Sequence, residues 1–186
     1  MNLWLRLIWY LLTLWRRSAI QLPGGTSRLN FRVLPTDLDT SAHLNNGRYL
    51  ALMDLGRLDI LVASGLWRAV LRHKWTPVAS AIKIRFRREL RLFQRFELAT
   101  RIVAWDATNV VMEQHFIFKD GPKAGQIAAQ ALFKGGLYDR ALKCFVPIER
   151  LMSEVGVQSA SPPLTADVDA FLKADDELKR ATQRLK

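Results

Sequence analysis

The chain has 186 residues, of which 49% are hydrophobic, and it carries 28 Lys and Arg against 17 Asp and Glu. This apolar content can bury one core without disulfides or metals, and the single cysteine, Cys144, excludes an intrachain disulfide framework. We therefore expect a reducing, cytoplasmic compartment. The net charge of +11 favours polyanions such as nucleic acid, anionic lipid headgroups or the phosphates of a nucleotide-bearing substrate, without choosing among them.

The first residues, MNLWLRLIWYLLTLWRR, predict an amphipathic helix within a segment over residues 1–22. The apolar run is shorter than the roughly 20 residues that span a bilayer, and charges after the run do not fit a signal peptide. We expect the segment to lie on an anionic membrane surface with a basic stripe along its edge, and the domain not to depend on it. The alternative is a helix docked on the protein's own surface or on a partner subunit. The stripe consists of Arg6, Arg16 and Arg17.

The elements predicted along the rest of the chain are one strand, one buried helix and a series of further strands. A strand over 30–35 ends at Pro35, and an almost wholly apolar helix runs from about 46 to 63 before Gly65. A short helical stretch over 66–74 follows, and then an antiparallel meander. Its strands cover 77–88, 94–105, 109–119 and 125–138. After a helix over 146–156, a linker leads to an amphipathic helix over 166–186, which needs a partner surface.

The loop before the buried helix, TDLDTSAHLNNGRYL, gathers carboxylates, a histidine and two amides. A carboxylate in such a loop can attack a carbonyl or activate water, and that chemistry also needs a fixed donor for the oxyanion that develops. The start of a helix supplies such donors, because its first backbone N–H groups have no intrahelical partner. The simpler interpretation is a capping loop, since Asp, Ser and Asn are ordinary N-cap residues.

The loop resembles the signature D-x-D-x-x-G-H-x-N-N-x-x-Y of hotdog acyl-CoA thioesterases related to 4-hydroxybenzoyl-CoA thioesterase. Ala42 replaces the usual Gly. With RRELRLFQRFELATRIVAWD further on, residues 28–150 look most similar to the thioesterase superfamily member 6 group. The resemblance implies an α+β hotdog fold over 28–157, in which a curved antiparallel sheet wraps around one long helix, and a homodimer with an acyl tunnel between subunits. The matching positions are Asp37, Asp39, His43, Asn45, Asn46 and Tyr49.

The resemblance also implies roles for these residues in acyl-CoA hydrolysis. Asp39 occupies the position of the catalytic carboxylate, either as nucleophile or as general base. His43 could orient Asp39, and Asn45 and Asn46 could place an amide beside the reacting oxygen or position water. The oxyanion donor would be a backbone N–H near Asn46 and Gly47, helped by the helix dipole. No metal or other cofactor is required.

Three further features are candidate substrate contacts, besides Tyr49. Asp54 lies two helical turns beyond Asn46, where a related branch carries its catalytic carboxylate, although an ion pair with Arg57 is the favoured interpretation. A basic strand places alternate side chains on one face, where they could hold the phosphates of coenzyme A or form a solvated outer face. Its residues are Lys83, Arg85, Arg87 and the adjacent Arg88. The chain has no Gly-rich phosphate loop, HExxH pattern or Cys/His metal spacing.

The sequence thus predicts a cytoplasmic, homodimeric acyl-CoA thioesterase, held at the inner face of a membrane if the N-terminal helix binds lipid. The alternative is a non-catalytic acyl-binding or membrane-tethered interaction module, which would tolerate Asp39→Ala. A nucleic-acid-binding protein ranks last, because the chain has no recognised motif and its basic residues are scattered.

Overall fold

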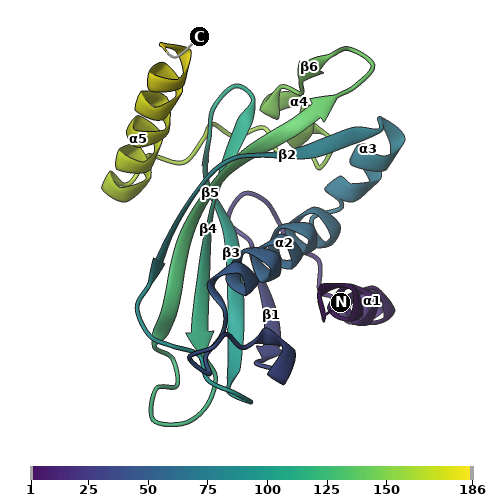
Figure 1. Ribbon diagram of the computed structural model, residues 1–186. Helices are drawn as coiled ribbons and strands as arrows, with labels where there is room; N and C mark the ends of the chain where they lie inside the picture. The colour runs from purple at the N-terminus through teal and green to yellow at the C-terminus, as the bar shows by residue number, and fades with distance from the viewer. Residues whose placement is uncertain (1, 185–186) are drawn as a thin grey trace.

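The computed structural model describes residues 2–184 and shows a curved antiparallel sheet wrapped around a long helix, α2 (Figure 1). The strand order is β1-β3-β4-β5-β2, and a two-residue β6 pairs with the end of β5. The predicted hotdog fold is confirmed. The strands are β1 Thr26–Arg32, β2 Trp75–Phe86, β3 Arg95–Trp105, β4 Asn109–Phe118, β5 Ile127–Asp139 and β6 Cys144–Phe145.

Helix α2 spans Asn46–Ala63, as predicted, and packs against the concave face of the sheet. Asn45 caps its start by accepting a hydrogen bond from the Gly47 N–H at 2.9 Å, and Gly65 lies just beyond its end at φ 84°. At Gly56 an added Cβ would lie 2.4 Å from Thr100 Oγ1. Because Gly56 has no side chain, α2 can pack closely against β3 at this point.

The predicted boundaries are close for the meander and wrong for the first strand. We expected that strand over 30–35, but β1 ends at Arg32, and Pro35 opens a 3₁₀ turn, η2 (Pro35–Asp37). The polar Ser27, although fully buried, interrupted the apolar pattern of the true strand. The remaining short elements are η1 Leu14–Arg16, α3 Leu66–Arg72 and α4 Ile148–Ser153.

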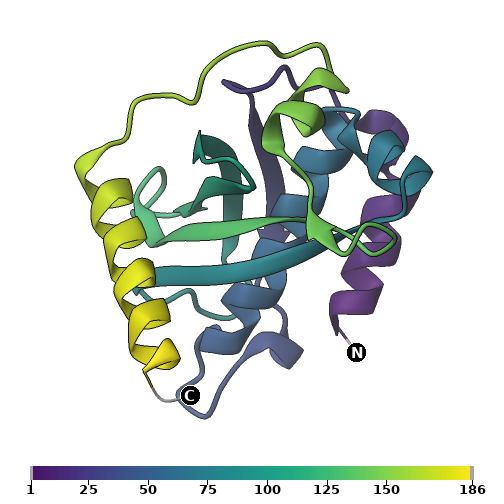
Figure 2. The same ribbon diagram turned by 90° about the horizontal axis from the view of Figure 1, so that it is seen from above.

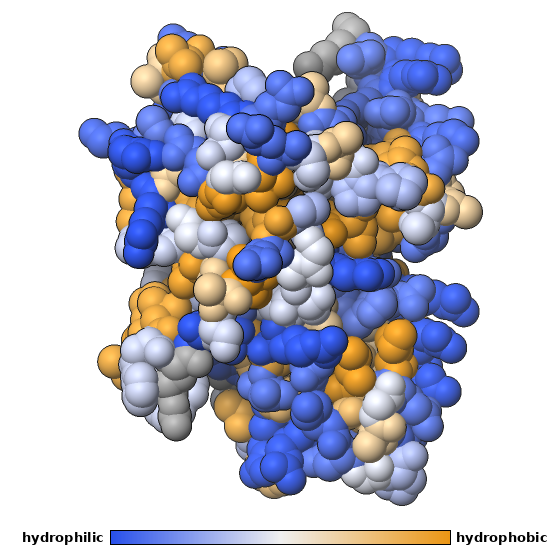
Figure 3. Space-filling model, turned by 180° about the vertical axis from the view of Figure 1, so that it is seen from behind, coloured by the Kyte–Doolittle hydropathy of each residue, from blue (hydrophilic) through white to orange (hydrophobic). Residues whose placement is uncertain are grey.

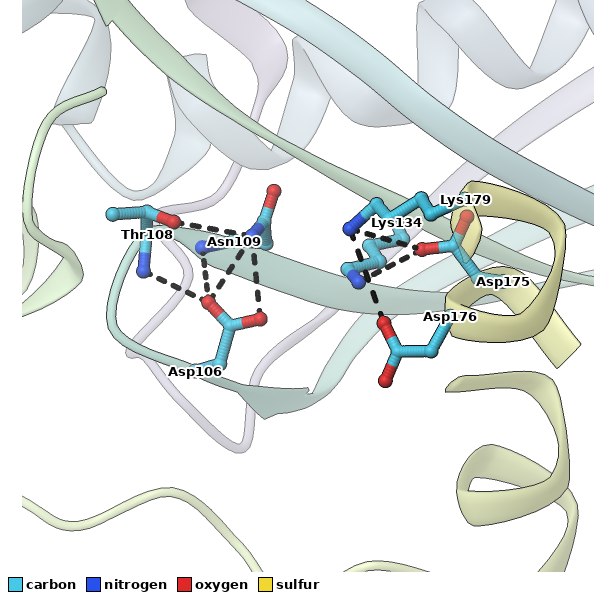
Figure 4. A network of polar contacts seen from close by, with 7 residues as sticks. All are labelled: Asp106, Thr108, Asn109, Lys134, Asp175, Asp176 and Lys179. Carbon is cyan, nitrogen blue, oxygen red and sulfur yellow. Dashed lines mark hydrogen bonds and ion pairs between the residues drawn. The ribbon is translucent and has the colours of Figure 1, made fainter. Parts of the chain in front are cut away.

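The C-terminal helix α5 (Ala166–Gln183) lies on the face of the sheet opposite α2 (Figures 1 and 2). Val168 and Phe171 are buried in one cluster with Leu132 of β5. Beside them Lys134, also buried, donates to Asp175 Oδ2 at 2.8 Å (Figure 4). The amphipathic helix predicted at this end therefore finds its partner surface on the outer face of the sheet.

The N-terminal helix α1 (Asn2–Leu12) docks on the domain through Arg6 and Tyr10 and through Leu3 and Leu7, which pack against the main core cluster. Arg6 forms an ion pair with Asp37, and the Tyr10 hydroxyl donates to Asp59 Oδ1 at 2.8 Å. The rest of its apolar surface faces outward, and its large side chains form part of the orange edge beside α1 in Figure 3. Within residues 2–184 no helix has the length and apolar content needed to cross a membrane. The outward side chains include Trp4 69%, Leu5 66%, Trp9 69% and Leu12 66% exposed.

Two expectations about the N-terminal segment are wrong. Arg6 and Arg17 do not line a lipid-facing stripe, because both turn inward, Arg6 to Asp37 and Arg17 to the fully buried Asp59. The side chain of Arg16 lies outside the described residues. The domain also does not stand apart from the segment, because the loop and α2 each supply one of these carboxylates.

Candidate functional site

The loop between η2 and α2 is a tight, internally bonded turn. The Asp39 N–H donates to the His43 carbonyl at 2.9 Å, and the Leu44 N–H reaches the Leu90 carbonyl of the β2–β3 connection at 2.7 Å. Ala42 has φ 60°, in the left-handed region that favours glycine. Ala42 therefore replaces the Gly of the signature at a position where a Cβ costs about 1 kcal/mol. The backbone still makes the turn that glycine would make.

Asp39 and His43 come together in this turn as the predicted pair. The His43 Nδ1 atom lies 3.0 Å from Asp39 Oδ2, and the two side chains are 32% and 22% exposed. The second oxygen, Asp39 Oδ1, accepts the Ser41 N–H at 2.9 Å. The carboxylate is thus held from both sides and still open to solvent.

The first turn of α2 begins three residues after His43, and its backbone N–H groups differ in whether they have an acceptor. The Asn45 side chain occupies the Gly47 N–H, and the Asn45 carbonyl accepts the Arg48 N–H at 2.8 Å. In the described part of the chain, no acceptor lies on the Asn46 N–H. Asn45 therefore acts as the N-cap, as the simpler interpretation of the loop has it, and of the two predicted donors Asn46 is the one that is open.

Tyr49 belongs to the core beneath the loop. Its side chain is buried, and its ring meets the rings of Phe86 and Phe116 edge-on, with centroids 5.1 and 4.8 Å away. Burial raises the pKa of Tyr49 to about 12, the charge of Asp39 adds to the rise, and a hydrogen bond from the Leu90 backbone opposes it. Tyr49 supports the site from below instead of opening onto it.

The ion pair between Asp54 and Arg57 is confirmed. Arg57 also donates to Gln114 Oε1 at 3.0 Å and lies 4.1 Å above the ring of Phe133, whereas the Asp54 side chain is 63% exposed. This pair borders a cavity of about 200 Å³ between α2 and the sheet. Its apolar lining includes Ile60, Val78, Met112, Leu137 and Ile148.

The cavity lies away from the loop and was not predicted. Asp54 is two helical turns beyond Asn46, about 12 Å along α2. Two adjacent glycines of β5, Gly135 and Gly136, also line the cavity. Paired glycines inside a strand mark a close approach of a ligand or another backbone, so FKGGLY was the sequence signal that pointed to this part of β5.

The basic strand splits between two places. Lys83 and Arg85 share a face, as predicted, but this is the outer face, in a groove with His115 of β4 and Asp167 of α5. Arg87 and Arg88 follow the end of β2, where both N–H groups donate to the Ala128 carbonyl at 2.8 and 3.0 Å. A single protomer therefore places Arg85 on the side of the sheet away from α2.

Within residues 2–184, no group of three His, Cys, Asp or Glu side chains is arranged to hold a metal ion. The carboxylates near histidines are instead paired with them. Glu113, for example, has its pKa lowered to about 2 by hydrogen bonds from His115 and Arg101.

Known proteins resemble this chain in both sequence and fold. A family model described as the thioesterase-like superfamily matches residues 33–173. The protein THEM6 of Danio rerio is 39% identical over 115 residues, which cover 62% of this chain and 57% of that relative. The chain spans about half the length of the curated relatives it matches.

Two solved structures share the fold at low identity. Slr0204, a 1,4-dihydroxy-2-naphthoyl-CoA thioesterase from Synechocystis, superposes with a TM-score of 0.60 at 13% identity, covering 70% of this chain and 95% of that chain. SAV2348 from Staphylococcus aureus, solved in complex with CoA, gives a TM-score of 0.62 at 13% identity, covering 75% of this chain and 84% of that chain.

Proposed function

Because the chain belongs to the thioesterase-like superfamily, we propose that it hydrolyses an acyl-CoA thioester to the free acid and coenzyme A. The observation that carries the proposal is the Asp39–His43 pair, 3.0 Å apart, beside the open Asn46 N–H at the start of α2. A fixed carboxylate and a positive helix end are the two groups that this reaction needs.

The proposed chemistry uses Asp39 on one side of the carbonyl and the helix on the other. Acting as general base, Asp39 takes a proton from water while the hydroxide adds to the carbonyl carbon. Acting as nucleophile, it adds directly and water then hydrolyses the anhydride. In either course the oxyanion lies against the Asn46 N–H, the C–S bond breaks, and the coenzyme A thiolate takes up a proton.

Asp54 is the second candidate for the catalytic carboxylate. It is more exposed than Asp39 and borders the apolar cavity, which suits the hydrocarbon part of an acyl group. Its contact with Arg57 and its distance from the loop make it the weaker candidate within one protomer.

The phosphates of coenzyme A are assigned to the basic residues around the end of β2, namely Arg85, Arg87 and Arg88. The CoA complex of SAV2348 shows that a protein with this fold binds CoA. Contacts to a remote phosphate act equally on ground state and transition state. Replacing Arg85 and Arg87 with Gln should therefore raise KM with little change in kcat.

A homodimer is the proposed assembly, paired through β2. This strand has 12 residues and lies at an end of the sheet order, with Ile82 and Phe86 39% and 43% exposed. A long edge strand presents unpaired N–H and C=O groups, which are a template for pairing with another chain. Sedimentation should give the mass of two chains, and Ile82→Lys should shift that mass toward the mass of one chain.

The outward face of α1 is proposed to rest on an anionic membrane surface on the cytoplasmic side. Tryptophan suits the headgroup region, and the chain's net charge of +11 complements anionic lipid. This placement would bring the protein to the membrane while the site remains open to soluble acyl-CoA.

One experiment tests the activity: hydrolysis of short, aromatic and long acyl-CoAs by the full chain, with Asp39→Asn and Asp54→Asn beside the wild type. We expect Asp39→Asn to lose roughly 10²-fold or more in kcat while remaining folded. Loss in Asp54→Asn alone would transfer the role to Asp54. Binding of acyl-CoA without hydrolysis, unchanged by Asp39→Ala, would establish the non-catalytic acyl-binding module instead.

A further inference from the structure

Two carboxylates bind the N-terminal segment to the domain, at opposite ends of α2. Asp37 is 2% exposed and accepts hydrogen bonds from Arg6 and from the Leu34 N–H at 2.9 Å. Asp59 is 0% exposed and accepts from Tyr10, from Arg17 Nε at 2.8 Å and from Ser27. The two anchors are of the same kind, but only one of them touches the candidate site.

Asp37 closes the base of the loop that carries Asp39 and His43. Its backbone carbonyl accepts the Asn45 N–H at 2.9 Å, so Asp37 joins the start of the loop to the N-cap of α2. Arg6 also donates to the Arg32 carbonyl at 3.0 Å, at the end of β1. One guanidinium thus spans α1, β1 and the base of the loop.

We infer that Arg6 is a positioning residue for hydrolysis: through Asp37 it holds the loop in the geometry that sets Asp39 against the start of α2. The inference rests on the proposed function, since it assigns Arg6 a role in the work of that same site. It makes α1 a part of the active site's support and not merely an attachment to the domain.

The physical reason is the cost of taking a charged donor away from a buried carboxylate. The Arg6 side chain is 11% exposed, and burial lowers its pKa while the charge of Asp37 opposes that fall. Without the guanidinium, the Asp37 carboxylate keeps the hydrogen bond from the Leu34 N–H but loses a charged donor, which favours protonation or a turn toward water. Turning moves residues 34–38 and with them the base of the loop. A displacement of about 1 Å at a reacting group can cost on the order of 10²-fold in rate.

Arg17 provides the matched control. It belongs to the same N-terminal segment and pairs with an equally buried carboxylate, but Asp59 lies about 21 Å along α2 from Asn45. Arg17→Gln should therefore loosen the segment and lower the melting temperature without moving the loop. Any effect that both variants share is an effect on stability alone.

The test compares full-length wild type, Arg6→Gln, Arg6→Lys and Arg17→Gln well below their melting temperatures. We expect Arg6→Gln to lose roughly 10-fold or more in kcat with little change in KM, Arg6→Lys to recover most of it, and Arg17→Gln to keep wild-type kcat. Hydrogen exchange at the amides of Asp39, Ala42 and Asn45 should quicken in Arg6→Gln only.

Equal losses of activity and equal loop exchange in Arg6→Gln and Arg17→Gln would overturn the inference, as would a fully active Arg6→Gln. Failure of the proposed function gives a different result. If Asp39→Asn stays active, or the wild type hydrolyses no acyl-CoA, the proposed chemistry falls. Loop exchange in the same variants still decides whether Arg6 holds the loop.

Discussion

The two terminal helices are both amphipathic, and they dock in opposite ways. Helix α5 buries its apolar side, with Val168 and Phe171 against the outer face of the sheet, and turns most of its charges to solvent. Helix α1 instead leaves much of its apolar surface outward, because Arg6 and Tyr10 enter the domain beside Leu3 and Leu7 while Trp4 and Trp9 remain 69% exposed. Figure 2 shows them on opposite sides of the molecule.

The two helices are held to the domain by different kinds of interaction. Burial of apolar area explains α5, since a helix with its hydrophobic face on the sheet gains free energy from that contact alone. It is only part of the account of α1, because Leu3 and Leu7 pack against the core while Arg6 and Tyr10 make charge-assisted hydrogen bonds to two buried carboxylates. A helix held this way keeps its apolar side available to a second surface.

Removal of α1 should give the largest effect on stability. Deleting residues 1–20 removes Arg6 and Arg17, which pair with the buried Asp37 and Asp59, and this should lower the free energy of unfolding by on the order of 3–5 kcal/mol. Urea unfolding of the truncated and full chains measures the loss. The same deletion with Asp37→Asn and Asp59→Asn should recover much of it, whereas an unchanged free energy would show that the anchors contribute little.

Phe171→Ala should break the α5 contact at a cost of about 3 kcal/mol, because it empties a packed site on the outer face of the sheet. Leu178→Ala is the matched control, since Leu178 lies on the same helix and is 68% exposed. It should change stability by about 0.5 kcal/mol or less. Thermal melts that show equal losses would mean that α5 docks by some other contact than the one described.

The Lys134–Asp175 pair should give α5 a pH dependence. The hydrogen bond from Lys134 lowers the pKa of Asp175, and for Lys134 the hydrogen bond and charge of Asp175 outweigh burial and raise the pKa. The stabilisation is therefore full between about pH 4 and pH 10.5, and is lost as pH falls through the lowered pKa or rises through the raised one.

Asp175→Asn tests this dependence. It should be less stable than the wild type at pH 7, and the difference should shrink as pH falls below about 4, because the wild type then loses its own ion pair. Urea unfolding of both proteins from pH 7 to pH 3 measures the difference. A difference that stays constant over this range would contradict the assignment.

The sequence predicted the parts of the fold that depend on local pattern. The boundaries of α2 follow from its apolar run and the Asn45 cap, and the resemblance of the loop to the thioesterase signature paired Asp39 and His43 as candidates. Patterns that depend on tertiary contact were missed. Ser27 looked like a break in β1 because its partner, Asp59, lies 32 positions away on α2.

The orientation of α1 was missed for the same reason. A helical wheel shows which side of a helix is apolar. It does not show that two buried carboxylates elsewhere in the chain, Asp37 and Asp59, bind polar groups of α1. At the site, the motif suggested the Gly47 N–H as an oxyanion donor. Only the structure shows that this N–H already donates to the Asn45 side chain. The cavity beside Asp54 required the packing of α2 on the sheet.

The smallest expected effect on stability comes from the outward face of α1. Trp4→Gln with Leu12→Gln replaces two side chains that are 69% and 66% exposed, so the free energy of unfolding should change by about 0.5 kcal/mol or less. The same double variant should lose most of its flotation with vesicles of anionic phospholipid, because apolar insertion supplies the attraction. Leu178→Gln on α5 is the control, removing one exposed leucine elsewhere without affecting flotation. Full-length protein that does not float with the vesicles would contradict the membrane proposal. Self-association that rises with concentration and disappears in the double variant would instead make a second copy of the chain the partner of this face.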